Sequence, residues 1–443
     1  MMFRYLKAFW IGLALVVVLG GTMTASAASR ATVTAVPQPA DPWTSVCEPD
    51  GYQSSGAIYR ICMPESDFWY NGNLVIWAHG YVAYNEEIHI PEDQLCPFEE
   101  LCINDVANIL GYGFATTSYS QNGLAVLPGM ADIIDLVDIY AAAHGQPESV
   151  FIIGASEGGL ITTLLVEQYP DIFDGGLAFC GPIGSFPGQV NYIGDFRGIF
   201  DYFFAEQLDP PMGDPLVIPQ WLIDTWDSYY PDVIEPVITD PANDSNLRQL
   251  FSVTKAPYDP TDFASSVLTT TEGVLWYDVF ATNNGVEVLG GIPYDNHDRW
   301  YSGSLDDELL NNSVLRVTAD PAALEEMHTH YNTTGRLDSP VVTMHTVGDQ
   351  IVPYWHEPLY MKKTIRSGAY PLRHWNIPIY DRYGHCAFEV NEALLGFVLM
   401  LLMAWNDPPT MEQISLILPD PADQAALLRQ VDAQMSARLR QLR

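Results

Sequence analysis

Short runs of Val, Ile, Leu and Phe recur along the chain, separated by longer stretches in which apolar and polar positions mix. The short runs predict buried strands at residues 74–78, 114–119, 149–153, 175–180, 340–345 and 373–380. Helical periodicity predicts helices at 130–143 and 160–169. Because strands and helices alternate, the pattern predicts the α/β class, with a mostly parallel sheet and helices on both faces.

The alternation stops between the fourth and fifth predicted strands. Residues 184–337 lack clear strands and hold helix-like stretches with many aromatic side chains. We therefore expect a large, mainly helical cap inserted at 184–337, between sheet-forming parts at 46–183 and 338–408. The apolar run at 393–405 is shorter than the ~20 residues of a membrane span, so it predicts a helix packed on the sheet. Residues 409–443 predict a C-terminal helix.

The first residues have the pattern of a secretory signal peptide, predicted at 1–27. Arg4 and Lys7 precede a short apolar run, and Ala25-Ser26-Ala27 forms a small-residue cleavage site. A membrane anchor is the alternative, although the run is short for a span. Residues 28–45, rich in Ala, Thr, Val and Pro, predict a flexible linker. We expect a secreted or extracytoplasmic protein with no stable membrane insertion after signal cleavage.

Composition narrows the range of partners. The chain has 443 residues, with 55 acidic and 19 basic side chains and a formal net charge of -36. This charge disfavours nucleic acid, anionic membranes and strongly anionic substrates. Apolar residues make up 48% of the chain, which is enough for a substantial core.

An even number of cysteines in an exported chain predicts disulfides. The cysteines are Cys47, Cys62, Cys96, Cys102, Cys180 and Cys386. Closeness in sequence favours Cys47–Cys62 and Cys96–Cys102. Cys180 and Cys386 remain: they either form a bond that fixes the loop around residue 385 or stay as two buried thiols. None of the cysteines has the spacing of a zinc site, and we expect no metal and no cofactor.

Gly154-Ala155-Ser156-Glu157-Gly158 matches the pattern G-x-S-x-G. A strand rich in Val, Phe and Ile leads into it and a helix follows, which is the setting of a nucleophile elbow. The alternative is a structural turn. A sharp turn there places the Ser156 hydroxyl at a helix N-terminus, where developing negative charge is favoured.

A serine hydroxyl needs a base, and the base needs an orienting acid. Asp349 follows the predicted strand at 340–345, and His385 follows the one at 373–380. The order Ser, Asp, His fits this arrangement. Asp381 is the competing acid, but it lies too close to His385 to come from the preceding strand. For both Asp349 and His385 the alternative is an ordinary polar loop residue.

The segments GASEGG, GDQIVP and GHCAF together resemble the serine branch of the α/β-hydrolase superfamily, and secreted bacterial esterase-like hydrolases within it. The resemblance implies that Ser156 is the nucleophile, Asp349 the acid and His385 the base. There is a distant similarity to tannases and feruloyl esterases, which have a Cys after the His, as Cys386 is here. Ala155 stands where those enzymes have a Cys before the Ser. GxSxGG and the Asp loop also resemble prolyl-oligopeptidase-like enzymes, but no propeller precedes the predicted sheet.

The same reasoning predicts two backbone amides that would bind an oxyanion. One is the amide of Glu157, directly after Ser156, and the other is that of Tyr81, after the strand that ends in His79-Gly80. A plain turn at His79-Gly80 is the alternative. His297, His328 and His330 have no metal-like grouping.

These features favour hydrolysis of a small-molecule or polymeric carboxylic ester, neutral and apolar or aromatic, through an acyl-enzyme. A serine peptidase of the prolyl-oligopeptidase type and a non-catalytic binding protein on a hydrolase scaffold are the alternatives. The oligomeric state is not predicted. Most aromatic residues of the cap should be core and some should face the pocket: Trp221, Trp226, Tyr229, Tyr230, Tyr258, Trp276, Tyr277, Trp300 and Tyr301. Trp355 and His356 are expected at the pocket mouth.

Overall fold

The structure is a computed structural model that describes residues 45–66, 69–97 and 101–441. The predicted signal peptide at 1–27 and residues 28–44 of the predicted linker lie outside the described residues. Ser45, the last residue of that predicted linker, is already part of a strand.

The described chain forms one nine-stranded sheet with the order β1-β3-β5-β4-β6-β7-β8-β9, in which β2 also pairs with β3. The strands are β1 (Ser45–Cys47), β2 (Gly51–Tyr52), β3 (Ile58–Pro64), β4 (Leu74–Ala78), β5 (Gly113–Thr117), β6 (Val150–Ala155), β7 (Gly175–Phe179), β8 (Val341–Gly348) and β9 (His374–Tyr383). The pairs from β5 to β9 are parallel, and β1, β2 and β3 pair antiparallel. The predicted mostly parallel sheet is confirmed.

Side chains of the central strands alternate between two apolar cores, because successive residues of a strand point to opposite faces. Val75 and Phe151 belong to one core. Ile76 and Ile152 belong to the other. Strands covered on both faces read as continuous apolar runs. This is why the sequence pattern located them.

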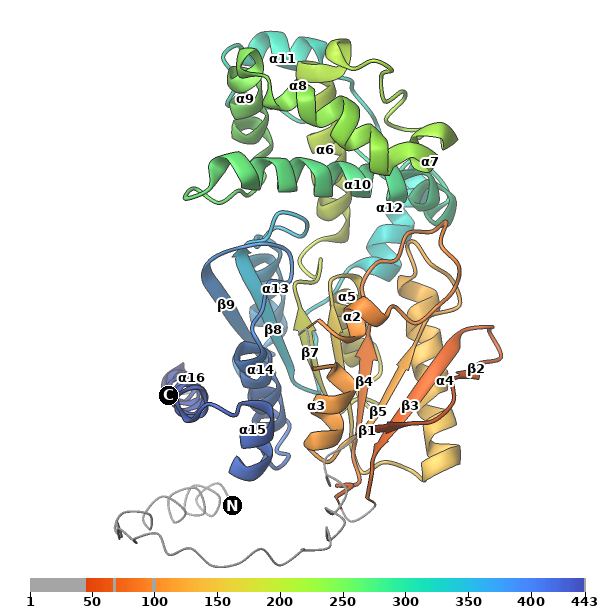
Figure 1. The fold of residues 1–443 in the computed structure, drawn as a ribbon, viewed down its shortest axis with the longest axis vertical. Coiled ribbons are helices and arrows are strands. Elements are labelled where there is room, and N and C mark those ends of the chain that lie inside the picture. The colour runs from red at the N-terminus through yellow and green to blue at the C-terminus, as the bar shows by residue number, and fades with distance from the viewer. Residues whose placement is uncertain (1–44, 67–68, 98–100, 442–443) are drawn as a thin grey trace, which may run out of the picture. The chain divides into compact units, whose positions relative to one another are not determined.

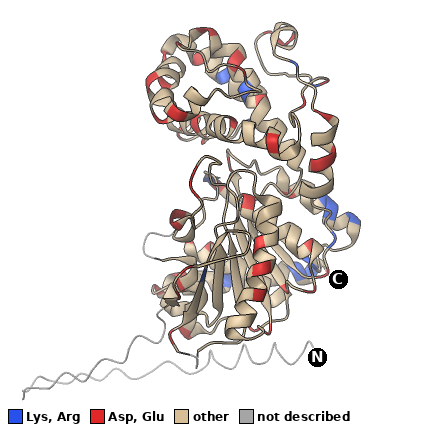
Figure 2. Ribbon diagram, turned by 90° about the vertical axis from the view of Figure 1, so that its right-hand side faces the viewer, with Lys and Arg blue, Asp and Glu red and all other residues tan. Residues whose placement is uncertain are grey.

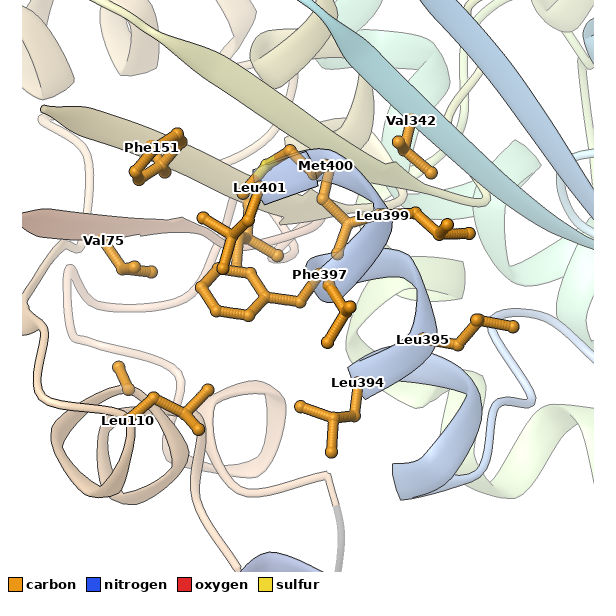
Figure 3. Close-up of a cluster of buried hydrophobic side chains, with 14 of the residues drawn as sticks. Val75, Leu110, Phe151, Val342, Leu394, Leu395, Phe397, Leu399, Met400 and Leu401 are labelled. Carbon is orange, nitrogen blue, oxygen red and sulfur yellow. The ribbon is translucent and has the colours of Figure 1, made fainter. Parts of the chain in front are cut away.

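Helices cover both faces of the sheet (Figure 1). One face packs on α4 (Val126–His144), α5 (Glu157–Gln168) and α13 (His356–Ser367). The other face of the sheet packs on α3 (Ile103–Ile109) and α14 (Val390–Met403). The short helix α2 (Glu92–Leu95) comes just before α3 in the chain. Figure 3 shows Leu394, Phe397 and Leu401 of α14 directed toward this core. Within the described residues, no helix is long and apolar enough to cross a membrane.

The segment between β7 and β8 is helical. It contains α6 (Phe186–Phe204), α7 (Gln220–Tyr229), α8 (Glu235–Thr239), α9 (Asp244–Thr254), α10 (Phe263–Leu289), α11 (Asp307–Ser313) and α12 (Pro321–Glu326). These helices share an apolar core of their own that includes Phe196, Leu250 and Val279. We therefore propose that residues 184–337 form the cap. Figure 2 shows acidic residues spread over the cap helices and over the helices beside the sheet.

The C-terminal part differs from the single helix expected at 409–443. It forms two helices, α15 (Met411–Ile417) and α16 (Pro421–Gln441). Pro419 and Pro421 explain the break, since proline has no N–H to continue a helix and is well tolerated at a helix start.

Both predicted local disulfides are present, Cys47–Cys62 and Cys96–Cys102, and a third joins Cys180 and Cys386. The first joins directly paired residues of β1 and β3. The third joins the residue after β7 to the residue after His385, so the bonded alternative for these two cysteines is the correct one. It links positions 206 residues apart, whereas Cys96 and Cys102 are 6 apart.

A disulfide that closes a long loop restricts the unfolded chain more than one that closes a short loop. We expect Cys180→Ala/Cys386→Ala to lower the free energy of unfolding more than Cys96→Ala/Cys102→Ala does, by about 3 kcal/mol on the chain-entropy model. Urea denaturation of both double variants under oxidising conditions measures this difference. An equal loss in the two variants would contradict it.

Candidate active site

Ser156 occupies a sharp turn between β6 and α5. Its backbone has φ 57° and ψ -121°, in a region that residues other than glycine rarely adopt. A Cβ on Gly154 would lie 2.2 Å from the carbonyl oxygen of Gly158. A Cβ on Gly158 would lie 2.0 Å from the carbonyl oxygen of Ala78. Both glycines of the G-x-S-x-G pattern are therefore required by close backbone packing.

The structure brings the three predicted site residues together. The Ser156 hydroxyl lies 2.9 Å from Nε2 of His385, and Nδ1 of His385 lies 2.8 Å from Oδ2 of Asp349. The three residues follow or end β6, β8 and β9, at the carboxyl edge of the sheet. Asp381, the competing acid, is an exposed residue of β9. His385 thus contacts Asp349.

Asp349 is buried, and its second oxygen is also bonded. Oδ1 accepts hydrogen bonds from the amides of Ile351 and Val352, each at 2.9 Å. Burial alone would raise the pKa of Asp349, but the charge of His385 and the hydrogen bonds from the two histidines beside it hold that pKa below its usual range. Asp349 therefore remains ionised while it orients His385.

A second histidine, His345, lies behind Asp349 and was not singled out from the sequence. It is buried, with Nε2 3.4 Å from Oδ2 of Asp349 and Nδ1 3.3 Å from Oε1 of Glu357. Nε2 also donates to the carbonyl oxygen of Val352 at 2.6 Å. Burial would lower the pKa of His345, but the bonds to the two carboxylates raise it to about 10. A positive charge on His345 thus stabilises the Asp349 carboxylate, at the same oxygen that contacts His385.

The Gly80-Tyr81 loop lies beside Ser156. A Cβ on Gly80 would lie 3.1 Å from the Cβ of Ser156. Gln94, which the sequence reasoning missed, holds this loop at two points: Oε1 accepts from the Gly80 amide at 2.6 Å and Nε2 donates to the Tyr81 carbonyl at 3.3 Å. The Tyr81 hydroxyl donates to the carbonyl of Phe280 in the cap helix α10 at 2.8 Å.

The Glu157 amide is the first of α5, and the first amides of a helix have no partner within it. The Glu157 side chain is buried and its Oε1 accepts from the Ala125 amide at 2.9 Å. Burial raises the pKa of Glu157 to about 8, although that hydrogen bond acts against the rise. Near pH 7 the side chain is therefore neutral and puts no negative charge beside Ser156.

Two cavities reach Ser156, with volumes of about 170 Å³ and 390 Å³. Among the nine cap aromatics named from the sequence, Tyr277 of α10 lines both. Of the other eight, five belong to the cap core or pack against it and three are exposed: Trp226, Tyr229, Tyr230, Tyr301 and Trp276 are the first group, and Trp221, Tyr258 and Trp300 the second. Trp355 and His356 were expected at the pocket mouth, and this expectation is wrong, because neither residue lines the two cavities. His356 is the first residue of α13, and its buried ring forms hydrogen bonds with Gln189 and with the Gly184 amide.

The ligand atoms of Cys180, His385 and Cys386 lie within 4.8 Å of one another. Zinc binds cysteine as the thiolate. Both sulfur atoms are here joined in a disulfide, so this group does not fit a metal.

A mostly parallel sheet of this strand order, with a serine at the strand–turn–helix junction after β6 and a helical segment after β7, is an α/β-hydrolase fold. No family model matches the chain. A curated relative is NocK of Nocardia uniformis subsp. tsuyamanensis, whose name assigns it as an esterase; it is 33% identical over 73 residues. The match covers 16% of this chain and 21% of NocK, so the chain spans about a fifth of the length of that relative.

Solved structures similar to the chain include feruloyl esterase B from Aspergillus oryzae, at 14% identity and a TM-score of 0.44, covering 77% of this chain and 74% of the other. The acylaminoacyl peptidase of Pyrococcus horikoshii has 11% identity and a TM-score of 0.36, covering 77% of this chain and 38% of the other. Because these TM-scores are below 0.5, the fold class rests on the strand order and on the turn at Ser156.

The pKa of Glu157 predicts how the reactivity of Ser156 depends on pH. Ionisation of Glu157 above pH 8 adds a negative charge where a second one forms during attack, so labelling of Ser156 by a fluorophosphonate should slow by about tenfold or more at higher pH. In Glu157→Gln the labelling rate at high pH should equal the rate near pH 7, because glutamine does not ionise. Labelling rates between pH 6 and pH 10 measure the effect.

Glu167→Gln is the matched control, since Glu167 lies on the same helix and burial also raises its pKa. An alkaline decline that persists in Glu157→Gln would show that another group titrates.

Proposed function

We propose that the protein is a secreted serine hydrolase that cleaves neutral carboxylic esters through an acyl-enzyme. The observation that carries the proposal is the position of His385, with one ring nitrogen 2.9 Å from the Ser156 hydroxyl and the other 2.8 Å from the Asp349 carboxylate. Such a chain of contacts converts a weak hydroxyl nucleophile into a reactive one.

Each residue has a defined part in the proposed reaction. Ser156 Oγ attacks the ester carbonyl carbon, and its proton passes to Nε2 of His385. The amides of Glu157 and Tyr81 bind the oxyanion of the tetrahedral intermediate. His385 then protonates the departing alcohol, and the acyl group stays on Ser156. His385 takes a proton from water, which adds to the acyl carbon; the bond to Ser156 Oγ then breaks, Oγ takes the proton from His385, and the carboxylic acid is released.

The cavity walls support an ester over a peptide substrate. Most of the residues that line each cavity are apolar, and Glu157 is neutral near pH 7. A peptide carries an N–H and a C=O at every residue, and burying these groups without hydrogen bonds costs several kcal/mol in total. An ester with apolar substituents has fewer polar groups to satisfy.

Export is supported by the three disulfides, since such bonds persist in oxidising compartments. The proposed substrate is a small-molecule or polymeric ester, without a nucleic acid partner, in keeping with the net charge of -36.

Variants of the three residues test the mechanism. Ser156→Ala, His385→Ala and Asp349→Asn should each lower kcat for p-nitrophenyl acetate by ~10³-fold or more, and a double variant should lose little beyond the worse single one. Steady-state kinetics on the acetate ester and on an aminoacyl p-nitroanilide would measure this and compare ester with amide hydrolysis.

Asp381→Asn is the matched control for Asp349→Asn and should keep full activity. Undiminished activity in Ser156→Ala would refute the mechanism. If Asp381→Asn were inactive and Asp349→Asn active, the acid would be Asp381. Preference for the anilide would favour the peptidase alternative, and no turnover or fluorophosphonate labelling would favour a binding protein.

A further inference from the structure

The two cavities at Ser156 lie in different parts of the structure. Tyr81, Ser156 and Tyr277 line both of them. The rings of Tyr81 and Tyr277 lie 5.6 Å apart between their centroids, and the Tyr81 hydroxyl is fixed to the carbonyl of Phe280. These two tyrosines therefore form a shared wall at the point where the cavities meet the serine.

The smaller cavity, which we call the cap cavity, is enclosed chiefly by α6 and α10. Val190 and Ile193 of α6 and Ala281 and Gly285 of α10 line it, together with Leu160 of α5. Arg197 also lines it, but this guanidinium is paired with Asp201 and with Asp278. The cap cavity thus presents apolar walls and an ion pair that is already satisfied.

The larger cavity, which we call the sheet cavity, extends between the sheet and the helices α3 and α14. Val75 and Phe179 line it from the sheet, and Leu394 and Phe397 line it from α14. Figure 3 shows Val75, Leu394 and Phe397 in this layer. His385 lines the sheet cavity and is not part of the cap cavity wall.

The volumes decide what each cavity can hold. A close-packed protein core has few voids larger than a water molecule. An apolar cavity of about 150 Å³ admits benzene. At about 170 Å³ and 390 Å³, each cavity has room for at least one six-membered ring, and the sheet cavity has room for more.

The position of His385 distinguishes the two sides of the substrate. During acylation the bond from the carbonyl carbon to Ser156 Oγ forms, the bond to the alcohol oxygen breaks, and that oxygen takes the proton held by Nε2 of His385. The departing alcohol must therefore lie on the His385 side, which is the side of the sheet cavity. The acyl group then extends past Glu157 and Leu160, which line only the cap cavity.

We propose that the substrates are neutral esters with a ring-sized apolar group on each side of the ester, the alcohol group occupying the sheet cavity and the acyl group the cap cavity. This inference rests on the proposed ester hydrolysis and specifies its substrate class. Because the sheet cavity is the larger, the bulkier group belongs on the alcohol side.

Four esters test the proposal: methyl acetate, benzyl acetate, methyl 3-phenylpropanoate and benzyl 3-phenylpropanoate. Each ring should raise kcat/KM by at least about tenfold over methyl acetate, and the two gains should combine in the fourth ester. Titration of the released acid at constant pH measures all four without a chromophore.

Two variants test which group of the ester occupies each cavity. Gly285→Leu adds volume to the cap cavity at a position where a Cβ meets nothing within 4 Å, and Ala393→Phe adds a ring to the sheet cavity. Gly285→Leu should reduce the gain from the phenylpropanoyl group by about tenfold and spare the gain from benzyl. Ala393→Phe should do the reverse. Thr269→Leu, exposed on α10, and Ala433→Phe, exposed on α16, are the matched controls.

The opposite pattern of losses would overturn the assignment of acyl and alcohol groups. Equal losses for both groups, or no gain from either ring in the unmodified protein, would overturn the inference of two cavities. Fluorophosphonate labelling of Ser156 and turnover of methyl acetate, measured in the same series, separate this failure from failure of the proposed function. If a variant is not labelled, the smaller substitutions Gly285→Ala and Ala393→Leu replace it.

Discussion

The close contact between the start of α5 and the end of β4 is the constraint on which the rest of the site depends. β4 and β6 are paired so that Ala78 lies opposite Gly154, and Gly158 packs on the carbonyl of Ala78 with no room for a side chain. This contact fixes the strained turn at Ser156 next to the loop that begins at His79. The hydroxyl, the first amide of the helix and the Gly80-Tyr81 loop therefore occupy one small volume without any flexible element between them.

Asp349 and His385 come from the other half of the chain and are held by a second set of constraints. The Thr346 hydroxyl donates to the carbonyl of Gly384 at 2.6 Å, and the Gly384 amide donates to the carbonyl of Gly348 at 3.2 Å. These bonds join the Asp349 and His385 loops to each other, and the disulfide from Cys386 joins them to β7. A buried carboxylate is costly unless it is paired. Asp349 has two amides and two histidines around it, so its charge is kept and its geometry is fixed.

The sequence located those features that depend on short stretches of chain. Short segments of sequence are enough to recognise the apolar runs at β4 and β6 and the turn around Ser156. The same holds for the short motifs around Asp349 and His385, whose order along the chain can then be read directly. Gln94 and His345 escaped because their importance comes from contacts across the fold: Gln94 holds a loop 14 residues away, and His345 contacts Glu357 of α13. Tyr277 was one of nine aromatic candidates in the cap, and only the fold shows that it is the one that lines both cavities. No spacing rule marks such residues. His356 was placed wrongly for a related reason, since the helix that begins there turns its side chain into the interior.

For the proposed substrates, the acidic surface and the mostly apolar cavities would act over different distances. Charges on the surface repel an anion, but at 0.15 M ionic strength their effect decays within about 8 Å. The net charge of -36 therefore influences approach more than binding. Inside, an anionic substituent would lose its hydration and meet apolar walls, a neutral Glu157 and an Arg197 that already has two carboxylate partners. An unpaired buried charge costs several kcal/mol, more than a screened surface repulsion supplies. We therefore expect the cavities themselves to disfavour charged substituents, and this discrimination should persist at high salt.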